Sequence, residues 1–142
     1  LQPARRTDVL THFMTALPAF FAYFSVAIAL IAVFLLVYVN VTPYAEGALI
    51  REGNVAAAIS LSGSLFGFVL PVANAIAHSD TLADLAAWGG VAGIVQILAY
   101  LAVRFGFPQL NSDIPAGKVA PAIFLAVVSV SVGLINAACM SY

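Results

Sequence analysis

The sequence predicts an all-α integral membrane protein with four transmembrane helices, built from two tandem, parallel two-helix hairpins. Three observations support this prediction. The composition is 63% hydrophobic and 8% charged, whereas a soluble domain is about half apolar and about a quarter charged. The charged residues leave four long windows that contain no charge. A segment of the chain also recurs further along the sequence.

Each window without charge is long enough to cross a bilayer as a helix. A helix of about 20 apolar residues, rising 1.5 Å per residue, covers about 30 Å of hydrocarbon. Every backbone N–H and C=O in lipid must be bonded within its own segment, which favours helices. The predicted spans are residues 17–39, 55–77, 85–103 and 119–140.

The spans divide the chain into four parts. Residues 1–16 are interpreted as an N-terminal extension or interfacial segment. This start resembles a signal peptide, but the apolar stretch that follows is too long and lacks a cleavage pattern, so we expect the first span to be retained. Residues 17–77 form the first hairpin, 78–84 a short connection, and 85–142 the second hairpin.

The repeat is clearest at the start of the second and fourth spans. The segments "GNVAAAISL" from Gly53 and "GKVAPAIFL" from Gly117 share Gly, Val, Ala and Ile at equivalent positions. Small apolar residues can match by chance in any two membrane helices, but the common spacing favours a true duplication. Each copy holds two spans, so the two copies have the same orientation and the repeat is parallel.

The basic residues predict the orientation of the chain in the membrane. Three of them lie in the long loops, residues 40–52 and 104–118, against Arg5 and Arg6 on the other side. Basic residues favour the cytoplasmic side, so we expect cytoplasmic long loops and periplasmic termini. The net charge is −1 and the sequence has no basic patch, which excludes nucleic-acid binding from the expected functions.

The second span carries its small and polar residues at helical spacing. Seven residues fall within a sector of roughly 60° at 100° per residue: Ala56, Ser60, Gly63, Gly67, Pro71, Asn74 and His78. The opposite side carries lipid-type residues: Leu61, Leu65, Phe68 and Val72. Pro71 lacks an N–H, so we expect a kink there and a free carbonyl at Gly67.

Two interpretations of the polar residues remain open. They are candidates for one intramembrane cluster: Ser60, Gly63, Gly67, Pro71, Asn74, Gln96 and Asn136. In the first interpretation they are interhelical contacts, each contributing about 1 kcal/mol or less. In the second they line a polar path or solute site beside the Pro71 kink. No span interior contains an Asp, Glu, Lys or Arg, which proton relays usually have, and this favours the first interpretation.

Several smaller expectations concern the ends of the spans. Tyr44 and Tyr100 suit positions at the membrane interface. Arg104 is expected to reach the headgroups or to pair with Asp113. Asn54 is a predicted N-cap of the second span.

The sequence predicts no enzyme. It contains no phosphate-binding loop, catalytic triad or metal signature. His12 and His78 are too far apart to suggest a metal site. Cys139, the single cysteine, has no neighbouring base or cation that would activate it. The sequence therefore predicts no catalytic residues, no metal and no cofactor.

Six segments together resemble the YjfL-type bacterial inner-membrane family: "AFFAYF", "TPY", "SGSLFGFVLP", "AWGG", "VQILAYLAVR" and "INAACMSY". The resemblance extends from about His12 to the end of the chain. It implies a bacterial inner-membrane location and a build of four spans and two repeats. It also implies a possible partner, because genes of this family often lie near those of phage-shock-type membrane-stress proteins. It supplies no catalytic or binding residues.

The leading functional hypothesis is a non-enzymatic interaction or anchoring component in envelope maintenance or membrane stress. Such a protein would bind the lipid bilayer and form a homo-oligomer through the small-residue faces of its helices. The alternative is a small transporter or channel with a polar path near Pro71.

Overall fold

The computed structural model describes residues 2–140, and over that range all of the regular secondary structure is helical. In chain order the helices are α1 (Gln2–Val41), α2 (Glu46–Arg51), α3 (Val55–His78), α4 (Leu82–Gly106), α5 (Leu110–Asp113) and α6 (Val119–Cys139). Four of them, α1, α3, α4 and α6, are long and apolar enough to cross a membrane. This confirms the predicted fold class. Residues 1, 141 and 142, which the predicted boundaries include, lie outside the described residues.

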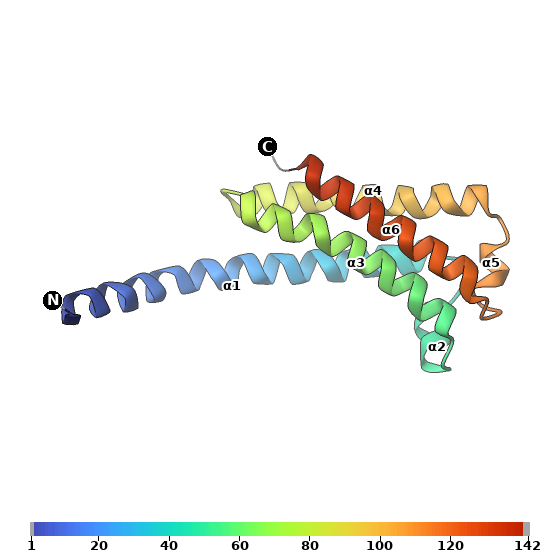
Figure 1. The fold of residues 1–142 in the computed structure, drawn as a ribbon, viewed down its shortest axis with the longest axis horizontal. Helices are drawn as coiled ribbons and strands as arrows, with labels where there is room; N and C mark the ends of the chain where they lie inside the picture. The colour runs from blue at the N-terminus through green and yellow to red at the C-terminus, as the bar shows by residue number, and fades with distance from the viewer. Residues whose placement is uncertain (1, 141–142) are drawn as a thin grey trace.

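The four long helices form a bundle from which part of α1 projects (Figure 1). Helices α3, α4 and α6 lie side by side, and the C-terminal half of α1 packs along them. The short helices α2 and α5 lie at one end of the bundle, whereas the α3–α4 connection lies at the other. α3 packs most extensively on α6 rather than on α1, its expected hairpin partner. The two predicted hairpins are therefore not separate packing units, and the repeat stays a prediction.

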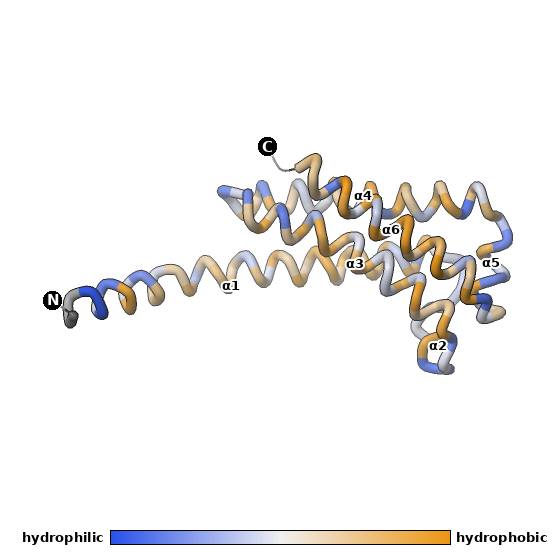
Figure 2. Tube along the Cα trace, viewed as in Figure 1, coloured by the Kyte–Doolittle hydropathy of each residue, from blue (hydrophilic) through white to orange (hydrophobic). Residues whose placement is uncertain are grey.

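Apolar residues cover all four long helices, as Figure 2 shows, with hydrophilic residues mainly in the loops and at the start of α1. Many large apolar side chains are exposed on the outside of the bundle, among them Ile94, Leu98, Val127 and Leu134. On a water-soluble protein so large an apolar surface would be abnormal. On this protein it is the surface that faces lipid.

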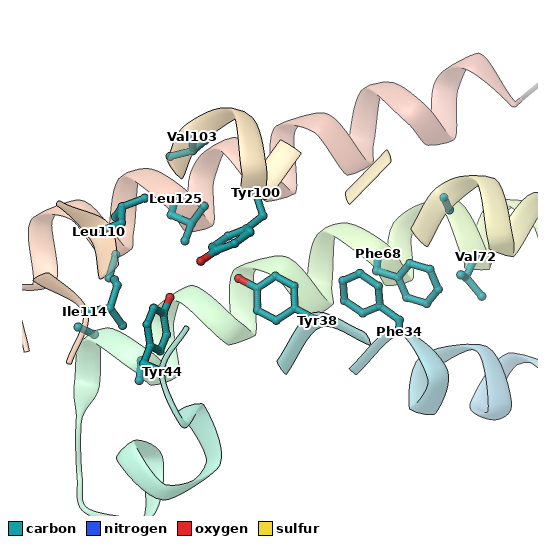
Figure 3. Close-up of a cluster of buried hydrophobic side chains, with 14 of the residues drawn as sticks. Phe34, Tyr38, Tyr44, Phe68, Val72, Tyr100, Val103, Leu110, Ile114 and Leu125 are labelled. Atoms are coloured by element: carbon teal, nitrogen blue, oxygen red, sulfur yellow. The ribbon is translucent and has the colours of Figure 1, made fainter. Parts of the chain in front are cut away.

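The core contains an aromatic contact that the sequence pattern did not predict. Phe34 of α1 stacks on Phe68 of α3 with ring centroids 4.3 Å apart and an interplanar angle of 4° (Figure 3). Phe68 and Val72 are both buried. The expectation that these two residues face lipid is therefore wrong. α3 is the central helix, so it is covered by α6 on one side and by α1 and α4 on the other.

Helix α1 begins well before the predicted span. It runs without interruption for 40 residues and contains Pro18 within its length. At 1.5 Å per residue this corresponds to about 60 Å, roughly twice the hydrocarbon thickness. α3, α4 and α6 have 24, 25 and 21 residues, which suits a single crossing. The segment interpreted as an extension, residues 1–16, therefore continues the first helix from Gln2 onward.

Both long loops end on a glycine in the left-handed region, Gly53 with φ of 86° and Gly117 with φ of 81°. This conformation is costly for residues with a side chain. Asn54 follows the first of them and caps α3, because its side chain accepts a 2.9 Å hydrogen bond from the Ala57 N–H. The predicted N-cap is confirmed. The Asn54 amide also donates to the carbonyls of Ile114 and Pro115, each at 3.1 Å, and so joins the two loops.

Replacing Asn54 with alanine should lower the free energy of unfolding by about 2 kcal/mol, since both the cap and the bonds to the second loop are lost. Asn54→Ser should cost only about 1 kcal/mol, because a serine hydroxyl still caps the helix but is too short to reach the other loop. Denaturation in detergent micelles, followed by circular dichroism, measures both. Equal losses in the two variants would mean that the loop contact adds nothing.

The second loop contains an ion pair that differs from the expected one. Asp113 pairs with Lys118, with nitrogen and oxygen 3.3 Å apart. Arg104 is not the partner of Asp113, and its side chain lies beside Tyr100. The expected pairing of Arg104 with Asp113 is therefore wrong. Asp113 is the last residue of the short helix α5, only five residues before Lys118, and this local contact is easier to form.

Candidate functional site

The predicted polar stripe of α3 is a real face, and α6 covers it. Ser60, Gly63, Gly67 and Pro71 are all buried. A methyl group built on Gly63 would overlap the backbone of Ala126 on α6. The two backbones therefore approach too closely for any side chain between them, which is the usual role of small residues in membrane helices.

The contact is closest where Gly67 meets Gly133. A methyl group on Gly133 would overlap the Gly67 carbonyl oxygen, so the Gly133 Cα hydrogen must face that oxygen. The carbonyl lies four residues before Pro71, which has no N–H to bond it. A weak Cα–H···O contact can supply part of that loss. The structure thus places the freed carbonyl that the sequence predicts against α6, while α3 remains helical through Pro71.

Gln96 joins three helices at the same level. Its side chain projects from α4 and is only 1% exposed. Its Nε2 donates to the carbonyls of Ser64 on α3 and Ser129 on α6, each at 3.2 Å. Its Oε1 has no hydrogen-bond partner among the described residues. One amide therefore bridges two backbones, which is the arrangement expected of an interhelical contact.

The last members of the predicted cluster lie nearer the α3–α4 connection. Asn74 donates to the Ala137 carbonyl at 3.0 Å, and Nδ1 of His78 lies 2.9 Å from the Asn74 carbonyl oxygen. The amide nitrogen of Asn136 is buried and has no partner in the described part of the chain. Six of the seven predicted residues thus gather along α3 and its neighbours, whereas Asn136 forms no hydrogen bond with them.

The cavities that the structure describes lie away from this stripe. One of about 620 Å³ lies between the end of α4, α5 and α6, and its lining includes Phe107, Pro108 and Phe124. Another of about 420 Å³ lies between the two long loops beside Asn54. Neither is lined by Asn74. Along the stripe, the described residues instead form hydrogen bonds and close backbone contacts with α4 and α6.

A second polar group, which the sequence did not indicate, lies at the loop end of the bundle. It consists of Tyr38, Tyr44, Glu46 and Tyr100, and we call it the Tyr–Glu cluster. Figure 3 shows the three tyrosine hydroxyls directed toward one another. The rings of Tyr38 and Tyr100 meet edge to face with centroids 5.3 Å apart. Ser64 donates to the Tyr38 hydroxyl at 2.9 Å.

The side chains of the Tyr–Glu cluster are withdrawn from solvent. Tyr38 and Tyr100 are 0% exposed, Glu46 is 1% exposed and Tyr44 is 9% exposed. Neither carboxylate oxygen of Glu46 forms a hydrogen bond of regular geometry among the described residues, and neither do the hydroxyls of Tyr44 and Tyr100. No described basic side chain forms an ion pair with Glu46. The cluster therefore contains buried hydrogen-bond donors and acceptors that form few hydrogen bonds with one another.

Burial determines the protonation of the groups outside the spans. It raises the pKa of the Glu46 carboxyl from its ordinary 4.5 to about 7, and the nearby Thr42 hydroxyl opposes this rise. Burial also raises the pKa of the Tyr44 phenol above its ordinary value of 10, and the neighbouring Tyr100, Tyr38 and Glu46 raise it further. Near neutral pH, Tyr44 is therefore a neutral phenol, while Glu46 is divided between its charged and neutral forms.

Tyr44 and Tyr100, which were expected at the membrane interface, have side chains that turn inward and are covered by the rest of the chain. Sequence reasoning missed the cluster since its members come from α1, the following loop, α2 and α4. The one available signal was a glutamate placed directly after a span, in "TPYAEG". Elsewhere in the described residues, no three His, Cys, Asp or Glu side chains gather at one place.

Comparison with known proteins gives the family. A family model described as "Domain of Unknown Function (DUF350)" matches residues 12–140. The UPF0719 inner membrane protein YjfL of Escherichia coli (strain K12) is 36% identical over 131 residues, which cover 92% of this chain and 99% of that protein. The UPF0719 transmembrane protein YshE of Bacillus subtilis (strain 168) is 28% identical over 92 residues, covering 65% of this chain and 69% of that protein. No solved structure matches the chain.

The matched region includes α3, α4, α6, most of α1 and both groups of polar residues described above. The relatives' printed names place them in membranes, in agreement with the length and composition of these helices. Because the family model covers most of its length, the chain belongs to the DUF350 (UPF0719) family of multi-pass bacterial inner-membrane proteins.

Proposed function

We propose that this protein is a non-enzymatic interaction component of the bacterial inner membrane and that it assembles with a second copy of itself through α1. The observation that supports this is a continuous apolar face on α1. The face begins with the exposed residues Leu10, Phe13, Phe20 and Phe24, with the half-buried Leu17 between them. It continues at the same alternating spacing of three and four with residues that pack on the bundle: Ala27, Ile31, Phe34 and Tyr38.

The two halves of this face differ in their burial. Phe34 and Tyr38 are almost fully buried, whereas Leu10, Phe13, Phe20 and Phe24 are each more than half exposed. Only 11% of the most apolar stretch of α1 is buried within the chain, compared with 50% for α3. The face that α1 uses to contact its own bundle thus continues toward the N-terminus, where the described residues provide little cover for it.

Lipid alone is a poor cover for the whole of this face. Helices α3, α4 and α6 each suit one crossing, so the bilayer lies around them, and the first part of α1 extends beyond its far side. Leu10 and Phe13 then lie at or past the headgroups. Apolar side chains at such a position gain free energy when another helix covers them.

A second copy is the occupant that this geometry favours. Alternating spacings of three and four are those of helices that pack nearly parallel over a long contact. A twofold contact also uses the same face of both chains, so no further surface is needed. The small-residue faces of α3 and α6 are occupied by each other, and for this reason we place the contact on α1.

Cysteine crosslinking tests this contact. In a Cys139→Ser background, a Phe13→Cys chain in native membranes should form a disulfide-linked dimer on oxidation. Thr15→Cys is the matched control, because it lies at almost the same height on the opposite side of α1. Equal crosslinking of the two variants, or none in either, would contradict a specific α1 contact.

A role in envelope maintenance, with a membrane-stress protein as a further partner, is part of the same proposal. The orientation is part of it too, with residues 40–52 and 104–118 in the cytoplasm and the termini in the periplasm, which the loop charges support.

The alternative function, a small transporter or channel, would need a path along the stripe of α3. The contacts of Gly67 and Gln96 leave little room for one, and solute flux into liposomes separates the two functions.

A further inference from the structure

We propose that the Tyr–Glu cluster is a binding site for one alkali-metal cation, held by the Glu46 carboxylate and the hydroxyl oxygen of Tyr44. The proposal concerns the loop end of the bundle and is independent of the assembly through α1. It rests on three properties of the cluster, which are its burial, its unmatched oxygen atoms and the lack of an ion pair to Glu46 among the described residues.

A buried carboxylate without a partner is costly. Transfer of an ionised group from water into a protein interior is offset only by an opposite charge, by hydrogen bonds or by protonation. Glu46 is 1% exposed, and both of its oxygens are without a regular hydrogen bond. A cation bound beside it would remove the net charge and use both oxygens.

The charged and titratable neighbours of the cluster do not neutralise the Glu46 carboxylate. From α1 the cluster receives Tyr38, and from α4 it receives Tyr100. The Arg104 side chain lies beside the Tyr100 hydroxyl and not beside Glu46, so Tyr100 is not counted among the cation ligands. The other basic group near α2, Arg51, is exposed and donates to the Gly47 carbonyl. Helix α3, which packs on α2, has His78 as its one titratable residue, at its far end.

The two ionic groups of the second loop are also accounted for, because Asp113 and Lys118 pair with each other. Among the described groups named above, Glu46 is thus the carboxylate that forms no ion pair.

The ligand atoms indicate the class of cation. Carboxylate and hydroxyl oxygens are hard ligands, which suit hard cations and not thiophilic metals. Calcium and magnesium sites commonly combine several carboxylates, carbonyls or waters to balance two charges. One carboxylate with a neutral phenol balances a single charge, so the chemistry matches Na⁺ or K⁺.

A proton competes for the same carboxylate. Burial places the pKa of Glu46 near 7, so the cation should bind in alkaline solution and be displaced by protons in acid. This competition gives the site a signature that nonspecific salt effects lack, because general screening does not depend on one carboxyl group.

The test is thermal denaturation of the purified full-length chain in detergent, at constant ionic strength. N-methylglucamine chloride is replaced stepwise by sodium chloride or potassium chloride, at pH 8.5 and at pH 5. We expect Na⁺ or K⁺ to raise the melting temperature by about 5 °C at pH 8.5, as a ligand that binds only the folded state would. At pH 5 the same exchange should change the melting temperature little.

Two variants assign the effect to the cluster. Glu46→Gln should abolish the response to the cation, whereas Glu52→Gln should retain it, because Glu52 is exposed and lies six residues away. If Glu46→Gln does not fold, Tyr44→Phe keeps the carboxylate and should raise the cation concentration needed for half of the effect about tenfold. A melting temperature that is the same in sodium, potassium and N-methylglucamine would overturn the proposal, and so would an unchanged response in Glu46→Gln.

Discussion

Replacing Gly133 with alanine should lower the free energy of unfolding by about 3 kcal/mol, a large loss for the addition of one methyl group. The methyl group would overlap the Gly67 carbonyl, and the obstacle is backbone rather than a flexible side chain. α3 and α6 would have to separate along their whole contact, which also weakens the Gln96 bridge. Unfolding in mixed micelles, followed by the fluorescence of Trp88, measures the change.

Gly90 supplies the matched control for this prediction. It lies within α4, and a methyl group built there meets no atom within 4 Å. Gly90→Ala should therefore raise stability slightly, by about 0.5–1 kcal/mol, because alanine favours the helix. Equal stability of Gly133→Ala and Gly90→Ala would contradict the close contact between α3 and α6 in the folded protein.

The stability of the protein should also fall as the pH rises through 7, in buffer free of alkali-metal ions. Glu46 has a pKa of about 7 in the folded chain against 4.5 ordinarily, so the folded state binds the proton more tightly. Its contribution is complete below about pH 4.5 and is lost as the pH rises through about 7. The difference between pH 4 and pH 9 should be about 3 kcal/mol.

Chemical denaturation across this pH range, in N-methylglucamine buffer, measures the profile. Glu46→Gln should remove this part of the pH dependence, because glutamine remains neutral throughout. Glu52→Gln should leave it in place, since Glu52 is exposed. A wild-type profile that Glu46→Gln does not change would mean that the carboxyl is not buried in the folded protein. This outcome is separate from the cation test, which could fail while the pH dependence remains.

The long helices were predictable because they depend on local properties of the sequence. Charge-free length and hydropathy fix where a helix can cross lipid, and all four spans were found. The residue at which α1 begins was not predictable, because a polar N-terminal segment can continue a helix without contributing to its apolar span. The polar stripe of α3 was likewise visible from spacing alone, and five of its seven predicted members are buried.

What the sequence could not supply was the arrangement of helices around one another. The apolar side of α3 was assigned to lipid, because spacing distinguishes two faces but does not tell lipid from a neighbouring helix. Phe68 shows the difference, since it is buried against Phe34. The Tyr–Glu cluster was missed for the same reason. Its members are separated by as many as 62 positions, from Tyr38 to Tyr100, and only the folded chain brings them together.

The central claim is that this chain acts by assembly through an open face of α1, while its polar stripe serves internal packing. The most direct measurement is the mass of the protein released from lipid nanodiscs, by native mass spectrometry. The account predicts two or more copies of the 14.8 kDa chain for the wild type and one copy when Leu10 and Phe13 are both replaced by serine. A single copy for the wild type, or an unchanged assembly in the double variant, would contradict it.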